Sequence, residues 1–188
     1  MVRVLLALLL LCAPAAAAPR VPLGDTIIRS QGAQTRYTFI RADGNCGFTV
    51  PATWDATGHL TNLPEAADAT FRIDDPALHG PASISVIVTI RPEAMSDMGD
   101  LPVATGRYKA WTIYTLAPPP PSMTGRFIDA VIRLHGVHVR ITGEFPRLPS
   151  GNAEHVTALL EAVMDSVAIE NKPYAPRPGE TIVRKAVR

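Results

Sequence analysis

Cys46 is the residue whose side chain is best suited to nucleophilic chemistry, and it stands in the sequence Asn45-Cys46-Gly47. A thiolate nucleophile needs a base or a positive charge beside it, and the chain has five histidines that could serve as one. None of them lies in a sequence context typical of cysteine proteases. We therefore predict that Cys46 is a small apolar side chain of the core, without a catalytic role.

Two of the histidines, His135 and His138, have the spacing H-x-x-H. That spacing suits a metal ion when both residues lie on one helix, because positions i and i+3 share a helix face. Here the first falls in an expected turn and the second on an expected strand. We therefore predict exposed hairpin histidines and no transition-metal site.

Four aspartates offer oxygen ligands of the kind that calcium prefers. Asp97 and Asp100 are close in sequence, and Asp74 and Asp75 could join them. The twelve-residue loop pattern of calcium-binding hands is missing, and acidic residues are common in turns. We expect no cofactor and keep calcium as the alternative.

Other signatures of catalysis and of nucleic-acid binding are missing from the sequence. It contains no G-x-S-x-G, no S-x-x-K and no glycine-rich phosphate loop, which argues against serine hydrolases and nucleotide-binding enzymes. The 18 Lys+Arg residues are balanced by 17 Asp+Glu, and aromatic residues make up 6% of the chain. This composition offers no basic, base-stacking surface, so we expect no nucleic-acid partner.

A run of four prolines, Pro118, Pro119, Pro120 and Pro121, is the most unusual local feature, and Met123 follows it. Consecutive prolines favour a polyproline II segment, which keeps its backbone solvated and loses little entropy on binding. The segment is a candidate binding edge for a protein partner. The alternative is a stiff connector between two strands.

The segments 126–134 and 137–143 predict a β-hairpin, because the dipeptide His135-Gly136 between them fits a two-residue turn. If Leu134 faces Val137, then Ile132 faces Val139 and Ala130 faces Ile141 on one apolar face. The same register gathers a second set of candidate binding residues on the outer face. They are Asp129, Arg133, His138 and Arg140.

Alternating apolar and polar residues, bounded by residues typical of turns, predict further strands, and one stripe of apolar residues predicts a helix. The expected strands cover residues 36–41, 46–50, 69–73, 83–91 and 107–116, and a short helical turn is expected within 93–101. Apolar residues recur at helical spacing from Val156 to Val167, and Ser150 or Asn152 is placed to cap this helix. We therefore predict an α+β fold, a twisted antiparallel sheet packed by a C-terminal amphipathic helix.

The N-terminus has the form of a secretory signal peptide. Arg3 precedes an apolar run over residues 4–12, and four alanines follow at 15–18, with cleavage expected after Ala17. We expect a periplasmic or secreted protein without stable membrane insertion after signal removal. The expected domains are a signal at 1–17, a polar lead at 18–35, a single domain at 36–169 and a disordered Pro-rich basic tail at 170–188.

The order of these features resembles that of PsbP/Mog1-like proteins. The opening Gly47-Phe48-Thr49-Val50-Pro51 with Trp54 is followed by the strand at 83–90, Gly106-Arg107-Tyr108, the hairpin and the helix that ends Met164-Asp165-Ser166-Val167. The resemblance covers about residues 44–169. It implies an α/β/α sandwich and mostly non-enzymatic roles, including accessory subunits, protein-binding modules and periplasmic immunity proteins.

Two functions from different classes follow. The first is a non-catalytic periplasmic accessory or protein-binding module whose partner is another protein of the cell envelope, with an immunity-type inhibitor of a toxin as a special case. The alternative is a small-ligand-binding or enzymatic domain that uses Cys46 or a histidine in a pocket between sheet and helix. The missing nucleophile–base motif favours the first.

Overall fold

The computed structural model describes residues 24–41, 44–63, 66–78, 80–89, 106–115, 125–134, 136–146, 153–172 and 174–183. Over these ranges the chain forms twelve strands, one 3-10 turn (η1, Pro76–Leu78) and one α-helix, α1 (Ala153–Ser166). The fold is therefore mainly β, and the prediction of an α+β fold was wrong. The resemblance to α/β/α sandwiches implied a single sheet between helices, whereas the described residues form two sheets and one α-helix.

The strands form two antiparallel sheets. The smaller has the order β11 (Ala168–Glu170), β3 (Gly44–Pro51), β2 (Gln34–Arg41), β1 (Thr26–Gln31) and β12 (Thr181–Val183). The larger has the order β4 (Asp55–Asn62), β5 (Ala66–Ile73), β6 (Ala82–Thr89), β10 (Val137–Pro146), β9 (Gly125–Leu134), β8 (Trp111–Thr115) and β7 (Gly106–Tyr108).

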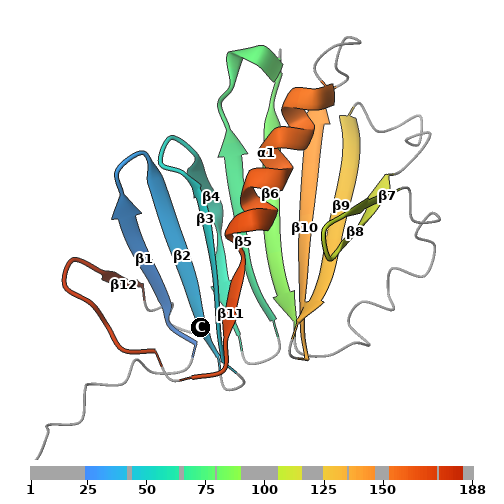
Figure 1. Cartoon of the computed structure of the whole chain (residues 1–188). Coiled ribbons are helices and arrows are strands. Elements are labelled where there is room, and N and C mark those ends of the chain that lie inside the picture. The colour runs from blue at the N-terminus through green and yellow to red at the C-terminus, as the bar shows by residue number, and fades with distance from the viewer. Residues whose placement is uncertain are drawn as a thin grey trace, which may run out of the picture.

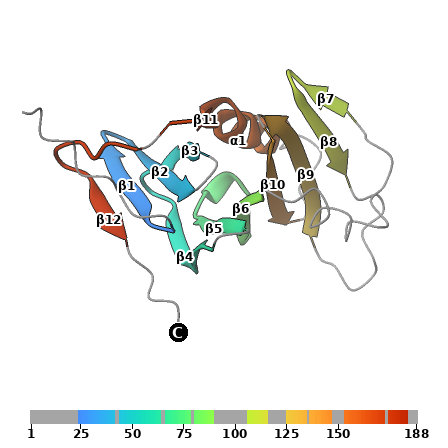
Figure 2. The same ribbon diagram turned by 90° about the horizontal axis from the view of Figure 1, so that it is seen from below.

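The smaller sheet and α1 lie side by side over one face of the larger sheet, which we call its inner face (Figures 1 and 2). Figure 2 shows β1, β2 and β3 facing the β4–β5 end, with α1 beside β6 and β10. One apolar core joins these three units. The opposite face of the larger sheet, its outer face, is left without a covering sheet or helix among the described residues.

Aromatic side chains hold the two sheets together. Tyr37 and Phe48 point inward from the smaller sheet and meet Phe71 of β5, with a Tyr37–Phe71 centroid distance of 4.9 Å. Phe39, Phe48 and Phe71 are 0% exposed. Rings at these offset and edge-on distances attract one another beyond the area they bury.

Helix α1 confirms the predicted apolar stripe. Val156, Leu160, Val163 and Met164 are buried against the core. Ser166 fixes the C-terminal end, since its Oγ donates to the Val163 carbonyl at 2.7 Å and accepts from the Thr49 backbone N–H at 2.8 Å.

The β9–β10 hairpin has the predicted register. Leu134 pairs with Val137, Ile132 with Val139 and Ala130 with Ile141. Gly136 has φ of +83°, a left-handed conformation that glycine adopts without a steric penalty.

The expected single strand at 107–116 was wrong, because the chain reverses at Lys109 and Ala110. Tyr108 pairs with Trp111 across this tight turn, so β7 and β8 form a hairpin. Lys109 takes φ of +51°. No Gly, Asn or Asp occupies the two turn positions, so the usual sequence signal of a two-residue hairpin is missing here.

Both terminal segments contribute strands to the smaller sheet. Strand β1 lies in the expected polar lead, and β12 lies in the expected disordered tail, where it pairs with β1. Strand β1 also pairs along its whole length with the next strand, β2, whereas β12 pairs with β1 alone. The signal at 1–17 and the helical turn at 93–101 lie outside the described residues.

Candidate binding site

The outer face of the larger sheet brings together the second set of predicted binding residues. Asp129 and Arg133 project there from β9, and His138 and Arg140 project from β10. His138 pairs with Arg133, as the predicted register requires. Pro118–Pro121 and Met123 fall outside the described residues, so the proline-rich candidate edge stays a prediction.

Asp129 is the centre of a hydrogen-bonded network on this face. The residue is 5% exposed. Arg140 donates to it through Nε (to Oδ1, 3.2 Å) and Nη2 (to Oδ2, 2.7 Å), and Thr142 Oγ1 donates to Oδ1 at 2.6 Å. A two-pronged contact of this kind fixes the guanidinium plane, so the network is rigid.

Strand register extends this network into a polar row across five strands. Asp129 lies between Tyr114 of β8 and Thr142 of β10, and the row continues through Ser85 of β6 to Thr70 of β5. The Thr70 and Ser85 hydroxyls are 2.9 Å apart. Sequence analysis missed the hydroxyl members, because Ser and Thr are common on strands and reveal their alignment only once the strand order is known.

Two buried polar atoms on the outer face have no hydrogen-bond partner among the described residues. His138 and Thr89 lie directly opposite each other on β10 and β6, and His138 Nε2 and Thr89 Oγ1 are both buried without a partner. Buried polar groups are nearly always satisfied, and leaving one unsatisfied costs about 1–3 kcal/mol. Burial lowers the pKa of His138, and the nearby Arg133 charge lowers it further, so the ring is held neutral.

The exposed charge on the part of this face formed by β7, β8 and β9 is positive. Arg133 and Arg107 are both exposed, and neither forms an ion pair with a described residue. Arg140 differs, since Asp129 neutralises it. The outer face thus combines a neutralised polar centre with unneutralised arginines toward one side.

Cys46 lies away from this face, in the core between the smaller sheet and α1. It is 1% exposed and packs among the core side chains. A nucleophile must reach its substrate, so this burial argues against the thiol-dependent alternative.

The aspartates of the calcium alternative do not assemble into a site within the described ranges. Asp97 and Asp100 lie outside these ranges. The oxygens of Asp75 interact with His155 Nε2 at 2.6 Å and with the Ala77 backbone N–H at 2.9 Å. Across the described parts of the chain, no three His, Cys, Asp or Glu residues gather as metal ligands would.

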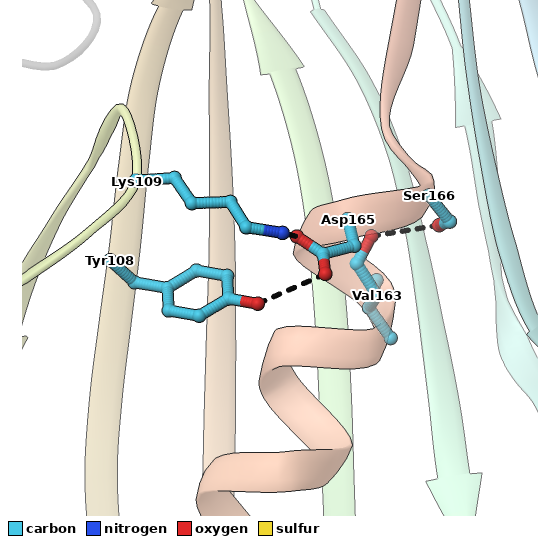
Figure 3. A network of polar contacts seen from close by, with 5 residues as sticks. All are labelled: Tyr108, Lys109, Val163, Asp165 and Ser166. Atoms are coloured by element: carbon cyan, nitrogen blue, oxygen red, sulfur yellow. Dashed lines mark hydrogen bonds and ion pairs between the residues drawn. The ribbon is translucent and has the colours of Figure 1, made fainter.

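A cluster of Tyr108, Lys109 and Asp165 joins the β7–β8 turn to the end of α1 (Figure 3). Asp165 accepts from Lys109 Nζ at 2.6 Å and from the Tyr108 hydroxyl at 2.9 Å. The hydrogen bond with Asp165 raises the pKa of Lys109, and the hydrogen bond from Lys109 lowers the pKa of Asp165. Each group holds its charge more firmly, which is the opposite of what proton transfer requires. The cluster is therefore a structural link.

Comparison with known protein families, with curated proteins and with solved structures gives no match to this chain. The resemblance to PsbP/Mog1-like proteins stays a prediction. Within the described ranges, α1 is too short to cross a membrane, and no other helix there could do so.

Proposed function

We propose that the protein is a non-catalytic binding module of the cell envelope, and that its partner is another protein that docks on the outer face of the larger sheet. The observation that carries the proposal is the pair of exposed arginines, Arg133 and Arg107, which lack an ion-pair partner among the described residues and stand on the same face as the rigid Asp129–Arg140 contact.

The charge on the outer face selects the chemistry of the partner. Arg133 and Arg107 are exposed and lack a carboxylate partner among the described residues. Arginine is enriched at protein interfaces, where its planar donors engage carboxylates. The partner surface should therefore carry Asp or Glu side chains.

The envelope location rests on the sequence. Arg3, the apolar run at 4–12 and the alanines at 15–18 form a signal peptide that would direct the chain to the periplasm or outside the cell. An immunity-type inhibitor is a special case, in which the acidic partner is a toxin acting in the envelope.

Capture from an envelope extract, comparing three forms of the protein, tests this proposal. The wild type is compared with Arg133→Glu, which reverses a charge on the outer face, and with Lys172→Glu, the same reversal just after β11 at a side chain 71% exposed. We expect one captured species with wild type and Lys172→Glu, and a loss of affinity of about tenfold or more with Arg133→Glu.

Melting temperatures of the three forms provide the folding control. If Arg133→Glu melts like the wild type and captures the same species with the same affinity, the outer face is not the docking surface and the proposal fails.

A further inference from the structure

The C-terminal segment crosses the outer surface of the smaller sheet from one edge to the other. Strand β11 forms one edge and β12 the opposite edge, and residues 171–180 join them. Tyr174 of this segment, which we call the strap, packs on Ile27 and Ile40 of the sheet. A cavity of about 250 Å³ lies between strap and sheet.

Two arginines form the sheet side of this cavity. Arg29 of β1 and Arg36 of β2 are directly opposite each other and both line the cavity. Like charges in this arrangement repel and destabilise a sheet. Neither side chain forms an ion pair with a described residue, so no carboxylate of the described chain contacts them to offset the repulsion.

Gly47 makes room for this arrangement. A side chain at position 47 would collide with the Arg36 guanidinium, which lies directly over the glycine. The backbone therefore leaves space for the Arg36 fork beside the cavity.

The carboxylates that line the cavity are used elsewhere. Glu180 accepts from the Tyr174 hydroxyl at 2.6 Å and from the Arg177 backbone N–H at 2.7 Å, which closes the strap on itself. Glu170 pairs with Lys172 at 3.2 Å. Burial, with the Glu180 contact, raises the pKa of Tyr174 to about 12, so its hydroxyl stays protonated.

We propose that this cavity binds a phosphate group, carried by inorganic phosphate or by a small phosphate monoester, between the Arg29 and Arg36 side chains. Two guanidinium forks can each engage two oxygens. A single carboxylate has only two oxygens to share, whereas a phosphate group has enough for both forks. The site is separate from the proposed docking face, which lies on the other sheet.

Thermal unfolding in phosphate, against chloride at matched ionic strength, is the test. Phosphate should stabilise the wild type in a saturable manner, because a ligand that binds only the folded state stabilises it. Arg29→Gln and Arg36→Gln should each lower the affinity for phosphate by about tenfold or more. In chloride alone both variants should melt at or above the wild-type temperature, since the like-charge repulsion is gone.

Arg72→Gln is the matched control, because Arg72 is an exposed arginine of the larger sheet. It should keep the full phosphate response. The proposal is overturned if phosphate acts no better than chloride on the wild type, or if the Arg29 and Arg36 variants respond as the wild type does.

Glycerol phosphate and succinate distinguish the ligand classes. Stronger stabilisation by glycerol phosphate assigns the site to a small monoester, and stronger stabilisation by inorganic phosphate assigns it to the free ion. Stabilisation by succinate equal to that by phosphate would contradict a phosphate site.

Discussion

The Asp129 side chain shows how single residues set the properties of the outer face. It is a nearly buried carboxylate, and Arg140 and Thr142 supply its hydrogen bonds. A buried pair of this kind costs more when one member is removed than it contributes when intact, because the other charge is left without compensation.

Asp129→Ala should therefore lower the free energy of unfolding by about 2–4 kcal/mol, toward the lower end of the range for buried pairs because Arg140 is partly solvated. Urea denaturation measures it. Asp165→Ala is the control, since it breaks an exposed pair with Lys109, and its effect should be much smaller. Equal losses in the two variants would show that Asp129 is not the centre of a rigid network.

His138 should make stability depend on pH. Burial lowers its pKa in the folded protein below the ordinary value of 6.5, so the unfolded chain takes up a proton first as pH falls. The stabilisation is complete above pH 6.5 and is lost as pH falls from there through the folded-state pKa. Melting temperatures between pH 7.5 and 5.5 should therefore drop more for the wild type than for His138→Gln. Parallel curves would contradict a buried neutral imidazole.

At the scale of elements, the packing of α1 on β10 depends on a glycine, Gly143, which has no side chain. Gly143 lies on the inner face of β10 under the helix, where an added Cβ would collide with the fully buried Phe145 ring and lie 3.1 Å from Leu160 Cδ2. Gly143 thus sets how closely the helix approaches the sheet.

Gly143→Ala should cost about 1–3 kcal/mol of stability, the usual range for overpacking a core. Gly106→Ala is the matched control on the edge strand β7, where an added Cβ would find its nearest neighbour at 4.0 Å. Chemical denaturation of both variants checks the difference. A tolerated Gly143→Ala would mean that the helix can shift away from the sheet at little cost.

Elements with a strong local pattern could be predicted from the sequence. Helix α1 has an unbroken apolar stripe, and the β9–β10 hairpin has a glycine turn whose register orders both faces, so it placed Asp129, Arg133, His138 and Arg140 together. The polar row to Thr70 could not be predicted, because it depends on β6 pairing with both β5 and β10.

The mainly-β fold could not be predicted either, because it also depends on which strands pair. Strand β12 has a weak pattern and is ordered by pairing with β1, which lies far away in the sequence, and sequence patterns report local preferences far better than distant pairings. The Arg29–Arg36 pair likewise becomes visible only when β1 and β2 are aligned.

At the scale of the whole molecule, the strap connects the two edge strands of the smaller sheet. It runs from β11 to β12 and covers Ile27 and Ile40 with Tyr174, away from the main core. The strap is therefore held to the sheet by this small apolar contact and by the hydrogen bond that Asn45 Nδ2 of β3 donates to the Lys172 carbonyl at 2.7 Å, whereas the Tyr174–Glu180 hydrogen bond lies within the strap.

Tyr174→Ala should lower stability by about 1–3 kcal/mol, because a partly buried aromatic side chain contributes less than a fully buried one. Amide hydrogen exchange should quicken in β12 and β1 and stay slow in β5 and β6. Tyr174→Phe keeps the packing and loses only the hydrogen bond to Glu180, so it should behave much closer to the wild type. Uniformly faster exchange across both sheets would show that the strap is not an independent unit.

The antiparallel closure of β1 by β12 also governs the order in which the protein can fold. The first and last described strands pair with each other, so a growing chain cannot finish the smaller sheet until residues 181–183 have been made. Pairing between distant segments first costs the entropy of closing the loop between them, and this cost slows folding. Until then β1 and β3 present open edges able to pair with other chains. Under the proposed export, the smaller sheet stays open at β1 until β12 has also crossed the membrane.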